Sequence, residues 1–333
     1  MIAKSIPHLP KSIKDKIYKT GQTRGADNDE VYQNRVGRNG TVLIPYAQWE
    51  LCRVPSPTDP VYENGFIVLI PPAAYFGDSN ITKTLSGKGL QLEHNALVFY
   101  ERRIDWVTSP PDSLGWVPGA RRRSPLGGQY VARIAATTSV DGTKINHGYN
   151  TTSMMGAGVR VYEYANTETI KDCRWQLEAL FWFCEDAEAV ALANGMTSED
   201  IRVRREWCLA TCQERDLLDL ERLRAVRIIN REDKTICPLC LLELSSQGFF
   251  DRVAQAEGRA VHDLTITQLN LFHILELRYG TLNHHPYNLG WGHHHCNVVV
   301  KDTGIVETVE WMRSVIERND DYTLSAITSK SDG

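Results

Sequence analysis

The chain has 333 residues, of which 42% are hydrophobic and 23% charged, and its formal net charge is −4. These values are typical of a soluble globular protein with two or three packed units. No apolar run reaches the eighteen or so residues that a membrane span needs, and the N-terminus lacks a signal-peptide core. Eight cysteines at this length favour a reduced compartment. The sequence therefore predicts a cytoplasmic protein without membrane contact.

Residues 1–165 are predicted to form a β-rich domain that begins with a polar, Lys/Arg-rich arm. The arm, about residues 1–36, is either a surface segment or a segment that follows a DNA backbone. Short apolar runs bounded by Gly, Pro, Asn and Asp indicate strands, and we expect most of them to pair in an antiparallel manner. The runs are 41–45, 65–71, 96–100 and 130–134.

Two features of this β-rich region could face DNA. An arginine triplet lies between turn signals, and its planar guanidinium groups fit phosphate oxygens and the guanine edge. The triplet is Arg121, Arg122 and Arg123. The aromatic residues either stack on an extruded base or, as is more usual for aromatic side chains, fill the core of the domain. They are Tyr46, Trp49, Tyr75, Phe76, Trp106 and Trp116.

Residues 166–233 have a helical pattern. One helix is expected to begin near Asn166, and Asn194-Gly195 is a stop signal. Thr197 followed by Asp200 predicts a new N-cap. On the second helical segment, residues three and four apart share one face, which either is solvated or lies along a DNA duplex. That face carries Arg224, Arg227 and Arg231.

Residues 234–320 contain two pairs of metal-type ligands. Cys237 and Cys240 form a CxxC pair, and His293 and Cys296 form an HxxC pair. Two such pairs can hold one zinc ion in a tetrahedral Cys₃His site that stabilises a small fold. His294 or His295 could replace His293 as the fourth ligand. A purely structural zinc ribbon is the alternative to a catalytic unit.

Between the two pairs, an apolar run ends in His273, a turn-rich loop follows, and Asn288-Leu289 precedes the second pair. Asn297 comes directly after Cys296. This order of residues resembles the HNH nucleases, the ββα-metal family, in their zinc-stapled branch. The resemblance implies an α+β fold with a C-terminal ββα-metal unit. Apolar residues at helical spacing over 305–316 predict a further helix that packs on this unit, and the polar tail over 321–333 is expected to be loose.

The resemblance also implies roles for single residues. His273 matches the general base, Asn288 the residue that positions the loop, and Asn297 a ligand of a catalytic Mg²⁺. A neutral His accepts a proton from water near pH 7. Many relatives place a metal-binding Asp before the base, whereas this chain has Phe272. Glu276 is the nearest substitute ligand. His284 and His285 are surface histidines in a turn or alternative bases.

The sequence therefore predicts a sequence-specific, double-stranded DNA endonuclease of the type II restriction kind, with structural Zn²⁺ and catalytic Mg²⁺. One HNH site cuts one strand, so a homodimer on a palindromic site is expected. Two alternatives remain: an HNH restriction endonuclease that depends on a modified base, and a non-catalytic zinc-containing DNA-binding protein.

Overall fold

The computed structural model describes residues 6–18, 39–53, 62–119, 126–134, 158–251, 253, 267–301 and 303–320. The chain folds into two compact units that each contain separate stretches of sequence. Unit 1 comprises Met1–Thr20, Lys171–Leu277 and His285–Gly333. Unit 2 comprises Gly21–Ile170 and Arg278–His284. The first twenty residues thus belong with the segments that carry the metal-type ligands.

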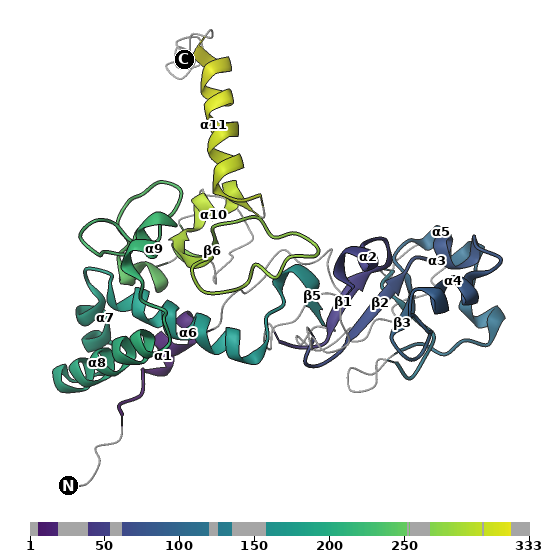
Figure 1. Ribbon diagram of the computed structural model, residues 1–333, viewed down its shortest axis with the longest axis horizontal. Coiled ribbons are helices and arrows are strands. Elements are labelled where there is room, and N and C mark those ends of the chain that lie inside the picture. The colour runs from purple at the N-terminus through teal and green to yellow at the C-terminus, as the bar shows by residue number, and fades with distance from the viewer. Residues whose placement is uncertain are drawn as a thin grey trace, which may run out of the picture. The chain divides into compact units, whose positions relative to one another are not determined.

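Unit 2 is built on a five-stranded sheet in which all neighbouring strands are parallel, in the order β4-β3-β2-β1-β5 (Figure 1). The strands are β1 Val42–Pro45, β2 Phe66–Ile70, β3 Ala96–Tyr100, β4 Tyr130–Ala132 and β5 Val159–Arg160. The first four confirm the runs identified in the sequence. Short helices return the chain between the first four strands: η1 Tyr46–Gln48, α2 Trp49–Cys52, α3 Pro72–Phe76, α4 Ile81–Gly87, α5 Arg103–Thr108 and η2 Pro111–Leu114. A further short helix, η3 Val161–Glu163, follows β5.

The antiparallel pairing expected for this region is wrong. Strand β3 is buried at every residue and β2 at every residue but the first. Side chains buried on both faces are the mark of a parallel sheet with helices above and below, whereas a half-exposed antiparallel strand alternates apolar and polar residues. Pro72 contributes as well, because a proline at the first helical position starts α3 directly after β2.

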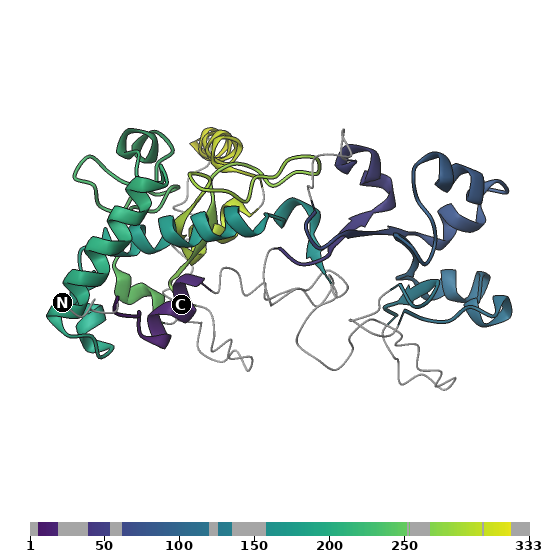
Figure 2. The same ribbon diagram turned by 60° about the horizontal axis from the view of Figure 1, so that its bottom comes forward.

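Unit 1 is mainly helical and holds one large apolar core. Its helices are α1 Lys11–Tyr18, α6 Thr167–Trp182 (which begins in unit 2), α7 Ala187–Ala193, α8 Ser198–Glu214, α9 Leu220–Ala225 and η4 Ser246–Phe249. The N-cap predicted at Thr197 is confirmed, and the structure adds a capping box between Thr197 and Asp200. Figure 2 shows α6 as the long teal helix of this unit. Its backbone accepts a hydrogen bond from the indole of buried Trp291 at Leu177, 3.1 Å.

The rest of unit 1 is an antiparallel strand pair followed by two helices. Strand β6 covers Leu269–His273 and pairs with β7, Leu289–His293, with His273 opposite Leu289. Helix α10, His294–Val300, follows β7 without a break, and α11, Ile305–Asp320, begins after Gly304. Gly304 has φ +96°, a conformation that favours glycine. Among the described residues, no helix combines the length and the apolar composition that a membrane crossing needs.

A buried ion pair joins two helices of unit 1. Arg204 of α8 donates two hydrogen bonds of 2.7 Å to the two carboxylate oxygens of Glu178 on α6. The guanidinium group also lies 4.8 Å from the ring centre of Trp207. Breaking such a pair is costly because the remaining charge stays buried without a partner.

We expect Glu178→Gln to lower the free energy of unfolding by about 3–5 kcal/mol, because Arg204 would keep its charge and lose its counter-ion. The double variant Glu178→Leu/Arg204→Met should recover much of this loss, since neither charge remains. Denaturant unfolding of both variants checks the prediction. A Glu178→Gln variant as stable as the parent would contradict it.

Candidate active site and metal centre

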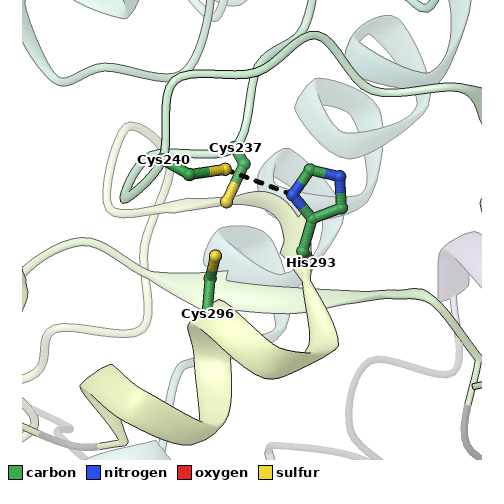
Figure 3. A group of neighbouring side chains, drawn as sticks. All are labelled: Cys237, Cys240, His293 and Cys296. Carbon is green, nitrogen blue, oxygen red and sulfur yellow. Dashed lines mark hydrogen bonds between the residues drawn. The ribbon is translucent and has the colours of Figure 1, made fainter. Parts of the chain in front are cut away.

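Four sequence-distant ligands meet where β7 ends and α10 begins. The Sγ atoms of Cys237, Cys240 and Cys296 and a ring nitrogen of His293 all lie within 4.8 Å of one another. Figure 3 shows the two cysteines of the CxxC loop facing His293 and Cys296, with His293 Nδ1 3.3 Å from Cys240 Sγ. The geometry therefore brings together all four residues predicted as zinc ligands, with His293 rather than either of its neighbours in the cluster.

The CxxC turn is shaped by its own backbone. Cys237 donates its N–H to the carbonyl of Leu242, and Leu241 donates to the carbonyl of Cys237, at 2.9 and 2.8 Å. Leu241 adopts φ +63°, a left-handed conformation that tightens the turn. These bonds bend the loop so that Cys237 and Cys240 both point to one place.

The donor set fits a zinc ion. Three sulfurs and one imidazole nitrogen are the ligands that structural zinc prefers. With Zn–S bonds of about 2.3 Å, a tetrahedral site places its ligand atoms about 3.8 Å apart, which is compatible with four ligand atoms that all lie within 4.8 Å of one another. Burial lowers the pKa of His293, which keeps the imidazole neutral for binding. Burial raises the pKa of the Cys240 and Cys296 thiols, so a metal must displace their protons.

His273, predicted as the general base, is the last residue of β6 and is partly exposed. Asn288 secures the chain directly after it. Its side-chain oxygen accepts a 2.7 Å hydrogen bond from the N–H of Leu275, and its backbone oxygen accepts one from Ile274. Asn288 itself is buried. The pair of bonds fixes the direction in which the chain leaves His273.

Asn297 joins α10 to the same strand. Its side-chain nitrogen donates a 3.2 Å hydrogen bond to the carbonyl of Leu271, two residues before His273. This bond uses the amide nitrogen, so the side-chain oxygen is the atom that can bind a cation. Asn288 and Asn297 thus bond to the chain on either side of His273, whereas the cluster lies at the other end of the strand pair, where His293 is opposite Leu269.

Phe272 is fully buried, and its ring lies against Gly292 so closely that a Cβ there would sit 2.4 Å from a ring carbon. The side chain before the candidate base is thus part of the core and not available to a cation. Glu276 is partly exposed, three residues beyond His273. Within the described residues, the Cys₃His cluster is the only group of three or more His, Cys, Asp or Glu close enough to hold an ion.

The remaining histidines have separate surroundings. His294 Nδ1 lies 3.1 Å from the side-chain nitrogen of Asn270 on β6, a contact that sequence reasoning missed because no spacing rule links the two positions. His295 is exposed and stacks on His293 at 5.4 Å. His285 Nδ1 is 2.7 Å from the carbonyl of Pro286, and His284 is buried.

The arginines predicted to share a helical face do not do so. Helix α9 ends at Ala225, and Arg227 lies beyond it with φ +63°. Arg224 is paired with Glu221 and Asp233, and Arg231 is exposed. The prediction of a shared helical face was wrong because α9 has only six residues and the chain turns after it. The arginine triplet 121–123 lies outside the described residues.

The model of the BstXI restriction endonuclease family matches residues 15–294 of this chain. The chain belongs to this family. The matched range includes His273, Asn288 and three of the four clustered ligands, and ends just before Cys296. No curated protein matches the chain in a sequence search.

One solved structure with a partial likeness is described as a type II restriction endonuclease. The match has 14% sequence identity and a TM-score of 0.29, and it covers 47% of this chain and 57% of that chain. The match therefore spans a little more than half the length of that solved chain.

We expect Cys240→Ser to remove the bound zinc and to unfold unit 1 at a lower temperature, because structural zinc contributes its binding energy to folding, about 10–16 kcal/mol in small zinc peptides. Elemental analysis and thermal unfolding with and without a chelator measure both effects. His295→Ala, which changes an exposed neighbour outside the cluster, is the control and should keep one zinc per chain. A parent protein free of zinc would refute the assignment.

Proposed function

We propose that the protein is a sequence-specific DNA endonuclease of the HNH type that hydrolyses one phosphodiester per active site. The observation that carries the proposal is the ββα arrangement in which His273 ends β6, two asparagines bond to the backbone on either side of it, and a Cys₃His cluster holds the start of α10. Membership in a restriction endonuclease family supports a DNA substrate and a nuclease reaction.

In this proposal, His273 accepts the proton of the attacking water. A partly exposed imidazole at a strand end is accessible to solvent and substrate. Asn288 positions this side chain through its two bonds to the chain that follows. A positioned base contributes about two to four orders of magnitude in rate. The zinc cluster takes no part in the chemistry and holds β7 and α10 in place.

The residues that would hold a catalytic Mg²⁺ are Asn297, through its side-chain oxygen, and Glu276. When bound, the cation would neutralise charge on the phosphate and on the leaving oxygen. Two protein oxygens suffice, because Mg²⁺ commonly keeps several waters and takes further ligands from phosphate. This donor set agrees with the burial of Phe272, which removes the ligand that relatives place before the base.

We further propose that unit 2 reads the DNA sequence and that two copies of the chain cut the two strands of one site. The ββα unit has few side chains left to read bases once His273 and the ligands are assigned. Guanidinium groups of arginines in unit 2 would contact guanine edges or phosphates, and Arg121–Arg123 are the first candidates.

A second candidate function is an endonuclease that depends on a modified base. In unit 2, Phe76 is partly exposed and stacks on Trp116 at 5.6 Å. Trp116 itself is partly buried, so Phe76 is the ring of this pair that offers a surface on which an extruded base can stack. Digestion of methylated and unmethylated copies of one plasmid separates the two functions: cleavage of only the methylated copy supports the second.

We expect His273→Ala to bind DNA nearly as well as the parent but to cleave it about 10²–10⁴-fold more slowly, because only proton transfer is lost. Gel-shift and plasmid-cleavage assays with Mg²⁺ measure the two quantities. His285→Ala is the matched control and should cleave at the parental rate. Equal loss of binding and cleavage in His273→Ala would show that His273 is structural, and absence of cleavage in the parent would favour a non-catalytic DNA-binding protein.

Changing Arg121, Arg122 and Arg123 singly to Ala tests where the sequence is read. Loss of a guanine contact should cost about 1–3 kcal/mol of binding and relax preference at a single base position. Loss of a phosphate contact should instead weaken binding to all sequences and reduce the dependence on salt. Binding to a panel of single-base variants at two salt concentrations distinguishes these results. A triple variant that matches the parent throughout would exclude the loop from recognition.

A further inference from the structure

Helix α11 has an apolar stripe that extends beyond the core it packs on. The stripe consists of Ile305, Val309, Met312 and Ile316, which share a face because they are three or four residues apart. Ile305 and Val309 contact the core of unit 1. Met312 is 38% exposed and Ile316 is 59% exposed. Figure 1 shows α11 extending away from α10.

A groove of about 580 Å³ runs beside this stripe. One wall is formed by Val309, Met312 and Ile316 of α11, and the other includes Leu239 of the CxxC loop and Val299 of α10. An amphipathic helix obtains most of its stability from the packing of its apolar face. The outer turns of α11 therefore present an apolar surface that a second helix would cover.

The charges beside the stripe favour a copy of α11 itself as that helix. Arg313 and Glu317 lie four residues apart on one flank, and neither forms an ion pair with a described residue. When two such helices run antiparallel with their centres at Ser314, Met312 lies opposite Ile316 of the partner subunit. On the same flank, Arg313 then comes within one turn of Glu317 of the partner subunit. Apolar contacts and opposite charges are thus matched twice across a two-fold axis.

We propose that α11 is the dimerisation helix of this protein and that the groove is covered by α11 of a second copy in antiparallel orientation. The inference deepens the proposed function, on whose two-fold homodimer it rests, but it does not depend on phosphodiester cleavage. The proposed contact surface combines both groove walls with the outer turns of the helix. A stable dimer commonly buries about 800 Å² per partner, so the outer turns alone would be too small.

The experiment is sedimentation velocity of the full chain over a wide concentration range, without DNA or added Mg²⁺. The parent is expected to dimerise, and Met312→Glu/Ile316→Glu to remain monomeric at every concentration. Trp311→Glu changes an exposed apolar residue of the same helix on another face and should dimerise like the parent. Circular dichroism and thermal unfolding establish that each variant is folded.

Charge reversal tests the antiparallel orientation and decides the matter if the double-glutamate variant does not fold. Arg313→Glu should raise the dimer dissociation constant about tenfold, because it places like charges together twice. Arg313→Glu/Glu317→Arg should restore the parental value. A monomeric parent, a dimeric Met312→Glu/Ile316→Glu variant, or a failure of the second charge change to restore dimerisation would overturn the proposal.

Plasmid cleavage separates this inference from the proposed function. A folded monomeric variant that nicks one strand but makes few double-strand breaks supports both. If the parent is a dimer but neither the parent nor any variant cleaves DNA, the proposed function fails while the dimer surface stands. If the parent cleaves DNA and is a monomer, the dimer surface fails alone.

Discussion

The junction between β7 and α10 is the constraint on which the candidate active site depends. Within two turns of chain it supplies His293 and Cys296 to the metal-type cluster and Asn297 to the backbone of β6. The cluster anchors the start of α10 to the CxxC loop, and Asn297 anchors the same helix to the strand that ends in His273. A short helix of seven residues has little stability of its own. Its position is therefore set by side chains that face two different neighbours.

The sequence was most informative where chemistry fixes spacing. Two ligand pairs and the order of His273, Asn288 and Asn297 could be recognised because metal ligation and hydrogen bonding need particular atoms. The order and direction in which the strands pair could not be predicted from the sequence in the same way. An apolar run such as β3 says that both faces are buried, but which strand lies beside it depends on the short helices that return the chain. The prediction that the three arginines share a helical face was wrong because α9 ends at Ala225. The spacing of residues along the sequence does not indicate where a helix ends.

Phe272 lies at the position where the resemblance to HNH nucleases predicts a cation ligand, and its side chain is part of the core instead. Its ring fills the space beside Gly292, where any larger residue would collide with it. The two positions are therefore coupled: a carboxylate in place of Phe272 would leave a cavity in the core and bury a charge. The cation-binding groups proposed here consequently lie elsewhere, on α10 and beyond the end of β6. The contact between Phe272 and Gly292 thus packs the strand pair and also determines which residues remain for the proposed Mg²⁺ site.

The path of the chain through the two units has a consequence for synthesis on the ribosome. The segment from Leu9 to the end of helix α1 is made early, yet its buried residues Leu9, Ile13 and Ile17 belong to the same core as Trp291 and Val300. The strands of unit 2 emerge before most of that core exists. A nascent chain can thus complete its parallel sheet while the hairpin around His273 is still unmade. The strand pair and α10, which carry the candidate site, are therefore among the last parts of the fold to form during synthesis.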